Sequence, residues 1–293
     1  LGVYVAIIFE EIKRRPNYIV EKIVNWKIYM DNAIFITGSS GFIGSSLINF
    51  LTEKKSETYE IVRINKNNYK DYIKTDFKLI NFYHFATHFS LNENDKLKIY
   101  EANYSYGEKL LNTLEIEKFN NFIYTNSIYS LSEKYAESSY IKSKNKFSNL
   151  IENIKKKKNF NFIELFLDNT YGANDKRNKV LNYIIKSVNE GAEVTLQDPD
   201  SYINLIDIEK LCEFLFNLSN KTADDKNILT SKYSYKLNSI LETALKINKG
   251  HKNIEVDKIP NNIKNEIKVI KINSDLEKYL KSNLWKTYWS LEV

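Results

Sequence analysis

The stretch NAIFITGSSGFIGSSLINFL, residues 32–51, decides the fold class of this chain. An apolar run, AIFIT, leads into glycines at positions 38, 41 and 44, and a segment with helical apolar spacing follows. This order predicts a buried strand, a tight turn and a helix. Glycines so placed permit the turn, let a pyrophosphate approach the backbone, and allow the helix to pack closely on the strand. A glycine triplet also occurs in plain turns, but the flanking strand and helix favour dinucleotide binding. The expected contacts are Gly38, Ser40, Gly41, Phe42, Ile43 and Gly44.

Beyond this unit, strands and helices alternate. Short apolar runs predict further strands over residues 59–65, 80–87, 120–127 and 160–167, and helical spacing predicts helices over 95–115 and 140–157. Such alternation is typical of a parallel sheet with helices on both faces. We therefore expect an α/β fold, a Rossmann-type doubly wound parallel sheet.

The pattern becomes irregular from about residue 171, which suggests a smaller, partly discontinuous C-terminal substrate-binding region. We expect a dinucleotide-binding domain over 30–170, with residues 202–220 returning to it. The substrate-binding region then takes residues 171–201 and 221–293. The only methionine is Met30, so residues 1–29 are either an appended extension or an ordinary N-terminal helix.

Composition limits the class of partner. The 293 residues carry a net charge of +6 that comes almost entirely from dispersed lysines. Nucleic-acid readers rely on arginine and on clustered patches, so nucleic acid is not an expected partner. No apolar run approaches the ~20 residues that a membrane span needs, so a membrane is not expected either.

Cysteine and histidine are scarce. The single cysteine, Cys212, rules out an internal disulfide and weakly favours a reducing compartment, the cytoplasm. His84 and His88 are four residues apart, but they fall where a strand runs into a loop, and no carboxylate or cysteine joins them. We therefore expect no metal site.

The end of the second strand bears on the choice of dinucleotide. An acidic residue there usually holds the adenosine ribose, whereas this chain has Asn65 followed by Lys66. Loss of the carboxylate and gain of a cation suit a 2′-phosphate. The cofactor is thus NADP or NAD, with a slight preference for NADP.

A second signal lies in SSYIKSK, where Tyr140 and Lys144 are four residues apart at the start of a predicted helix. The two side chains should share one face. A free tyrosine is a poor acid or base at neutral pH, and a nearby ammonium should lower its pKa. The motif follows the strand at 120–127, whose end should lie at the carboxyl edge of the sheet, where such sites form.

Several motifs together resemble the extended short-chain dehydrogenases/reductases of the NAD-dependent epimerase/dehydratase family, which act on nucleotide sugars. ITGSSGFIG resembles their cofactor turn, FYHFAT their strand ending in His-Leu-Ala, and YEANYSYGEKLL their Asn-x-x-Gly helix. NFIYTNS resembles the strand that carries a catalytic hydroxyl, and DNTYGAND resembles their Asn-x-Tyr-Gly-Pro segment.

The resemblance implies roles for individual residues. Tyr140 would be the acid/base, Lys144 would lower its pKa and bind the nicotinamide ribose, and Ser127 would hydrogen-bond the reacting oxygen. Further cofactor contacts would be Asp76, as the best counterpart of an adenine-contacting aspartate, and Phe85, Ala86, Thr87 and Asn103. The family also implies a homodimer, formed through the helices near residues 97–115 and 140–156.

The reaction class follows from two further segments. Sugar 4,6-dehydratases of this family have an Asp-Glu pair after the catalytic hydroxyl residue, but Ile128 and Tyr129 stand here, which argues against dehydration. LDNTYGANDKRNKV resembles the CDP-abequose and CDP-paratose synthase type, so we favour a 4-keto-sugar reductase over a 4-epimerase. A non-catalytic dinucleotide-binding homologue is the further alternative. Asn169, Arg177 and Lys179 would then bind the nucleotide-sugar substrate.

Overall fold

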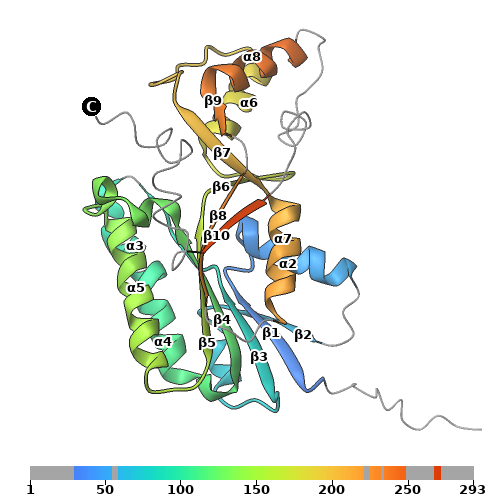
Figure 1. Ribbon diagram of the computed structural model, residues 1–293, viewed down its shortest axis with the longest axis vertical. Helices are drawn as coiled ribbons and strands as arrows, with labels where there is room; N and C mark the ends of the chain where they lie inside the picture. Colours follow the sequence, from blue (N-terminus) through green and yellow to red (C-terminus); the bar gives the residue numbers. More distant parts are fainter. Residues whose placement is uncertain are drawn as a thin grey trace, which may run out of the picture.

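The computed structural model describes residues 30–54, 59–90, 92–220, 225–231, 234–248 and 267–271. A seven-stranded sheet forms its centre, in the order β10-β8-β5-β4-β3-β1-β2 (Figure 1). Its strands are β1 (Asn32–Thr37), β2 (Glu60–Ile64), β3 (Leu79–His84), β4 (Phe119–Ser127), β5 (Asn161–Leu167), β8 (Asp225–Ser231) and β10 (Ile267–Lys271). All neighbours run parallel except β10, which is antiparallel to β8. The predicted Rossmann-type sheet is confirmed.

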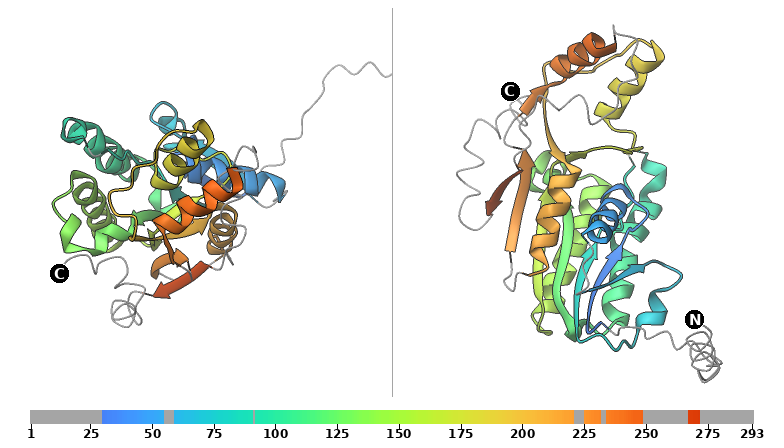
Figure 2. Two further views of the ribbon diagram at one scale, coloured as in Figure 1. Left: turned by 90° about the horizontal axis from the view of Figure 1, so that it is seen from above. Right: turned by 90° about the vertical axis from the view of Figure 1, so that its right-hand side faces the viewer.

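Helices cover both faces of this sheet (Figures 1 and 2). On one face lie α2 (Phe42–Glu53) and α7 (Ile208–Leu218), which pack against each other. On the other lie α3 (Lys96–Tyr100), α4 (Tyr106–Thr113) and α5 (Ser139–Lys155). The strands carry apolar side chains on both sides, because each face of the sheet packs against helices in its own apolar cluster. Cys212 lies in the α2–α7 cluster, as expected of a core residue.

The helix predicted over 95–115 is a continuous run with an irregular centre. Between α3 and α4 the backbone widens into a π-helical segment, η3 (Glu101–Ser105). Such segments are rare and are frequent at functional sites. The segment contains Asn103, one of the predicted cofactor contacts.

A smaller region lies beyond the carboxyl ends of the main strands (Figure 1). A three-stranded sheet of β6 (Asn169–Tyr171), β7 (Tyr202–Asp207) and β9 (Ser234–Lys236) packs with α6 (Val180–Glu190) and α8 (Leu237–Asn248). This region has a separate apolar cluster. It therefore faces the edge at which α/β proteins bind their ligands.

The predicted domain limits differ from the structure at two points. Within residues 202–220, α7 packs on the main sheet, whereas β7 belongs to the smaller sheet. Residues 225–231 and 267–271 were expected in the substrate-binding region, but β8 and β10 extend the main sheet beyond β5. In β8 the buried apolar residues are Ile228 and Leu229, and polar residues flank them on both sides. So short an apolar run does not predict a strand from the sequence. Residues 1–29 lie outside the described part of the chain.

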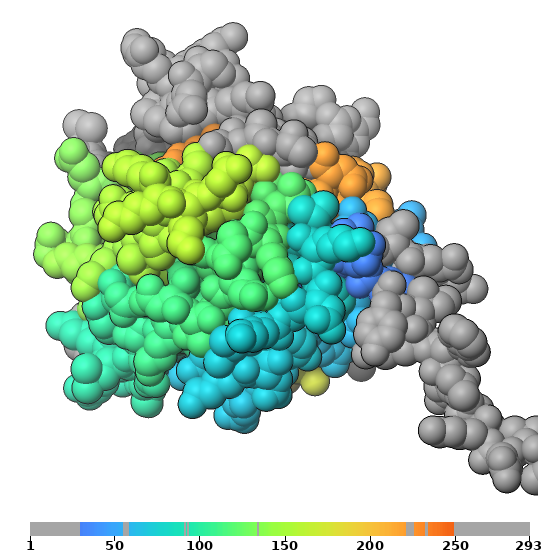
Figure 3. Space-filling model, turned by 90° about the horizontal axis from the view of Figure 1, so that it is seen from below, coloured from blue at the N-terminus to red at the C-terminus, as the bar shows by residue number. Residues whose placement is uncertain are grey.

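On the side away from β10, the main sheet ends at β2. Within the described residues no strand lies beyond β2, where the usual strand order places a third. Residues 65–78 connect β2 to β3 through a short 3-10 helix, η1 (Tyr69–Tyr72), which packs on the core. Figure 3 views the molecule from below, the end where the parallel strands begin, and the described surface there comes mainly from segments that precede β5.

Candidate active site

The turn between β1 and α2 is closed by contacts that leave no room for side chains. Gly38 has a φ of +64°, and a Cβ on it would lie 2.7 Å from the backbone of Phe85 and Ala86. A Cβ on Gly44 would lie 2.3 Å from the Gly38 carbonyl oxygen. The first glycine thus permits the turn and the third permits close packing, as the spacing predicts.

Helix α2 begins at this turn without a side-chain cap. Gly41 stands at the N-cap, no side chain caps the first N–H groups, and no acidic residue lies in the first turn. Free N–H groups and the helix dipole favour an anion at such a point. Ser40 is exposed beside it, whereas Phe42 and Ile43 are half-buried against the core. This cradle fits the diphosphate of a dinucleotide.

The end of β2 is organised by Asn65. Its side-chain oxygen accepts hydrogen bonds from the backbone N–H groups of Asn67 and Asn68, at 2.8 and 3.1 Å. Lys66 lies 3.5 Å from Glu101, and the two side chains are 57% and 61% exposed. So exposed a pair contributes little to stability. The Lys66 ammonium can therefore turn to a ligand at this edge.

Asp76 does not join this group. It is exposed and lies three residues before β3, whose first residue, Leu79, pairs with Asn32 at the start of β1. Parallel strands share their amino edge, so Asp76 is at the end of the sheet opposite the glycine turn. This position contradicts the prediction that Asp76 contacts the adenine. The short connection between β2 and β3 lacks the strand that would carry such a residue.

The exit of β3 is tied to the end of β1. His84 Nδ1 lies 2.9 Å from Thr37 Oγ1, and the Ala86 N–H donates to the same oxygen at 3.2 Å. Burial lowers the pKa of His84 to about 3, so its ring is neutral. Phe85 directs its side chain into the core, while its backbone lies against Gly38. The segment after β3 thereby packs against the cofactor turn and fixes its position.

Asn103 holds the segment after β3 against α5. Its side-chain oxygen accepts from Thr87 Oγ1 at 3.0 Å and from the His88 N–H at 2.7 Å. Its amide nitrogen donates to the His88 carbonyl at 3.2 Å and to Ser143 Oγ at 3.1 Å. The sequence suggested a cofactor contact here, and the structure shows a junction of three elements.

Tyr140 and Lys144 lie together at the start of α5, and Lys144 bonds to β4 two residues before Ser127. Ser127 ends the strand, and its hydroxyl accepts the Tyr129 N–H at 3.3 Å. Tyr140 lies in the first turn of α5 and meets the exposed ring of Phe89 edge-on, at 5.1 Å between centroids. The Lys144 amine lies 5.6 Å from the centre of the Tyr140 ring and donates to the Thr125 carbonyl at 2.7 Å.

Burial controls the pKa values of this group. Burial raises the pKa of Tyr140 to about 12, against a hydrogen bond with Thr87 and the Arg177 charge, which lower it. Burial lowers the pKa of Lys144 to about 7, and the Glu164 carboxylate opposes that shift. The prediction that an ammonium lowers the Tyr140 pKa is therefore wrong for this structure. The buried amine loses part of its charge.

A neighbouring residue, Asn126, was missed from the sequence. Its oxygen accepts the Ser127 N–H at 2.8 Å and the Ser130 hydroxyl at 2.6 Å, and its amide donates to Glu164 Oε1 at 2.8 Å. Only its place beside Ser127 could have suggested a role, because the Glu164 contact joins separate strands.

Arg177 reaches from the smaller region to the glycine turn. Its guanidinium bonds twice to Asp175, at 2.7 and 2.6 Å, and once to the Thr170 carbonyl at 2.8 Å. It also stacks 4.1 Å over the ring of Phe42. The predicted substrate ligand thus lies beside the start of α2, with part of its donor capacity already used.

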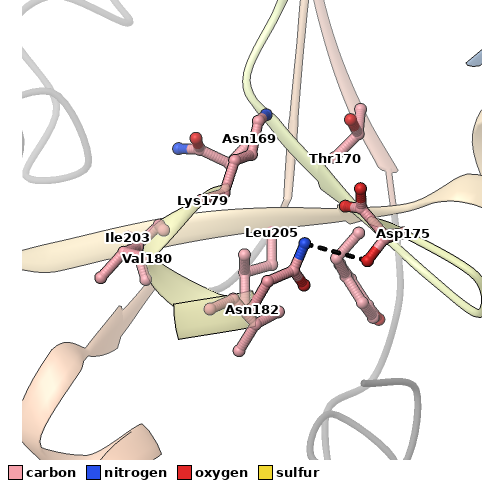
Figure 4. A pocket seen from close by; sticks show the side chains of 10 residues that line it. Asn169, Thr170, Asp175, Lys179, Val180, Asn182, Ile203 and Leu205 are labelled. Carbon is pink, nitrogen blue, oxygen red and sulfur yellow. Dashed lines mark hydrogen bonds between the residues drawn. The ribbon is translucent and has the colours of Figure 1, made fainter. Parts of the chain in front are cut away.

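Lys179 and Asn169 line a small pocket (Figure 4). Thr170 and Asp175 lie across it, and Asn182 donates to the Asp175 carbonyl at 3.1 Å. Burial and Arg177 lower the pKa of Lys179 to about 8, whereas Asp175 and Asp168 raise it. No hydrogen bond of its amine is found within the described part of the chain. The Lys179 amine of this pocket therefore lies in the region beyond the carboxyl ends of the main strands.

Within the described ranges, no three His, Cys, Asp or Glu side chains are grouped to hold a metal ion. None of the helices in those ranges is both long and apolar enough to cross a membrane.

Comparisons with known proteins identify the family of this chain. Residues 34–228 match the family model described as NAD dependent epimerase/dehydratase family. A CDP-abequose synthase of Yersinia pseudotuberculosis is 24% identical over 240 residues, which cover 73% of this chain and 83% of that protein. One of Salmonella muenchen is 25% identical over 185 residues, which cover 56% of this chain and only 62% of the relative.

A solved structure shares the fold. The UDP-glucuronic acid 4-epimerase of Bacillus cereus, in complex with NAD, has a TM-score of 0.65 at 17% identity. The match covers 74% of this chain and 83% of that one.

Proposed function

We propose that this chain, which belongs to the NAD dependent epimerase/dehydratase family, acts at C4 of a nucleotide-linked sugar as a 4-keto-sugar reductase. The observation that carries the proposal is the pairing of Tyr140 with Lys144 at the start of α5, with Ser127 at the end of β4, on the same edge of the sheet as the glycine turn. A binding module has no need of a buried phenol and amine placed together.

The protein's own groups have distinct tasks in this proposal. A nicotinamide dinucleotide, when bound, supplies the hydride that adds to the sugar carbon. Tyr140 holds the proton that passes to the keto oxygen as the carbon–oxygen double bond becomes a C–O–H group. The Ser127 hydroxyl orients that oxygen, and Lys144 offers positive charge as negative charge develops on it.

The protonation state of Tyr140 suits the proton-donating step of reduction. With its pKa raised to about 12, Tyr140 keeps its proton at neutral pH and is ready to donate it. Oxidation of a sugar hydroxyl, the first half of epimerisation, would need the phenolate instead. The CDP-abequose synthase relatives also support the reductase and suggest a cytidine diphosphate sugar.

A 4-epimerase is the second candidate, supported by the fold shared with an NAD-containing epimerase. A 4,6-dehydratase is less favoured because Ile128 is buried after Ser127 and Tyr129 follows it, so no carboxylate stands there. NADP is preferred slightly over NAD because Lys66 is exposed at the end of β2.

Two measurements test the proposal. First, the purified protein is denatured and any released dinucleotide is identified by mass spectrometry. Second, CDP- and UDP-linked 4-keto-6-deoxy sugars are mixed with NADPH or NADH, and loss of the reduced nicotinamide absorbance is followed.

We expect an empty site and NADPH oxidation with the CDP-linked sugar. Tightly retained NAD with interconversion of C4 epimers would establish the epimerase instead. Failure to bind either dinucleotide would favour the non-catalytic homologue.

A further inference from the structure

A buried carboxylate stands inside the main sheet. Glu164, on β5, is only 1% exposed and pairs in register with Tyr124 of β4. Its Oε2 lies 3.1 Å from the Lys226 amine, which also pairs with Glu152 of α5 at 2.9 Å. A charge buried in a sheet is costly even when paired, and replacing a buried ion pair with apolar residues is often neutral or stabilising. Its presence therefore suggests a role besides packing.

The other carboxylate oxygen leads to the catalytic strand end. Glu164 Oε1 accepts the Asn126 amide at 2.8 Å. That bond fixes which way the Asn126 amide faces, so its oxygen points to the Ser127 N–H and the Ser130 hydroxyl. One carboxylate thereby orients the backbone from which the Ser127 hydroxyl projects.

The charge of the same carboxylate also acts on Lys144. The Lys144 side chain is 4% exposed, and its amine donates to Thr125 of β4 at 2.7 Å. The other titratable groups around the amine are Tyr124 of β4, with its ring centre at 4.9 Å, Tyr140 of the same helix, and neutral His84 of β3. Glu164 is thus the anionic group that interacts with Lys144, and its charge opposes the effect of burial.

We propose that Glu164 is a positioning residue of the active site, which orients Ser127 through Asn126 and places a negative charge near the buried Lys144 amine. The inference rests on the proposed function, because it takes Ser127 and Lys144 as the groups that act on the substrate. Glu164 itself touches neither substrate nor cofactor.

Two variants separate its two effects. Glu164→Gln keeps an oxygen that can accept the Asn126 amide but removes the charge, and Glu164→Leu removes both. Glu152→Gln is the matched control, because it loses the outer partner of Lys226 and leaves Glu164 in place.

We expect Glu164→Gln to lower kcat about tenfold at neutral pH with KM within about twofold, because binding groups are untouched. The alkaline limb of its kcat profile should move to lower pH by about one unit, since Lys144 loses its proton more easily. Glu164→Leu should lower kcat further, and Glu152→Gln should keep the wild-type profile. A Glu164→Gln profile that matches wild type would overturn the inference.

A second readout needs no substrate. The free energy of unfolding is measured against pH for wild type, Glu164→Gln, Lys144→Met and the double variant. The Glu164→Gln curve should begin its Lys144-dependent rise at lower pH, and this difference should vanish in the Lys144→Met background. If no sugar is turned over but this coupling is found, the proposed function fails and the Glu164–Lys144 link stands. If turnover is found without any coupling, the inference fails and the function stands.

Discussion

The amine of Lys144 lies 5.6 Å from the centre of the Tyr140 ring, yet its 2.7 Å hydrogen bond goes to the carbonyl of Thr125. The Lys144 amine therefore contacts the face of the Tyr140 ring and makes its hydrogen bond to the backbone of β4. Burial moves their pKa values apart, to about 7 for Lys144 and about 12 for Tyr140. At neutral pH the phenol holds its proton while the amine is about half charged, which suits proton donation to a substrate.

Replacing Tyr140 with Phe tests the proton donor. Phenylalanine keeps the ring contact with Phe89 but has no proton to give, so turnover should fall by about 10²–10⁴-fold. Dinucleotide affinity and thermal stability should stay close to wild type. Tyr183→Phe, in α6, is the control and should keep full activity. Loss of folding in Tyr140→Phe would instead indicate a structural role.

Lys144 predicts a specific dependence of stability on pH. Its pKa is lowered on folding from 10.5 to about 7, so between these values the unfolded chain binds more protons than the folded one. Stability should therefore rise with pH across this window, by up to about 1.4 kcal/mol per unit. Denaturant titrations should show that the rise is lost in Lys144→Met and kept in Lys142→Met, an exposed position on the same helix. An unchanged slope in Lys144→Met would refute the shift.

The parts of the site that the sequence predicted depend on local spacing. Gly38 and Gly44 are constrained by contacts within one turn and with the neighbouring strand exit, and two residues separate each glycine of the triplet from the next. Tyr140 and Lys144 share a helix face because they are four residues apart. The position of Ser127 at a strand end is predicted because it directly follows the run that forms the strand. Each of these features needs only the few residues around it.

The parts that were missed depend on which strands become neighbours. Glu164 and Asn126 meet because β5 lies beside β4, and an isolated Glu in FIELFL gives no sign of that partner. Asp76 was misplaced because residues 65–78 return to the amino edge without a further strand. The pKa of Tyr140 was expected to fall because proximity to Lys144 was visible in the sequence, whereas the depth of burial was not.

Gly38→Ala tests the cofactor turn. Alanine in the left-handed region costs about 1–2 kcal/mol, and here its Cβ would also meet backbone atoms at 2.7 Å. Gly191 offers a matched control, because its φ is +66° and nothing lies within 4 Å of a Cβ there. Gly191→Ala should lose only modest stability and bind dinucleotide normally. Gly38→Ala should lose more stability and, by calorimetric titration, at least about tenfold in affinity. Equal dinucleotide affinity of the two variants would argue against diphosphate binding at the Gly38 turn.

Lys66→Ala tests the preference between the two dinucleotides. The Lys66 ammonium is exposed at the end of β2, where its partner among the described residues is Glu101, at 3.5 Å on the surface, so it can turn to a 2′-phosphate. Its removal should weaken NADPH binding about tenfold and leave NADH binding nearly unchanged, as measured by nicotinamide fluorescence. Lys78→Ala is the control, because that exposed lysine pairs with Asp31 at the opposite edge of the sheet. An equal loss for both dinucleotides, or none for either, would remove the argument for NADP and leave NAD as the cofactor to test.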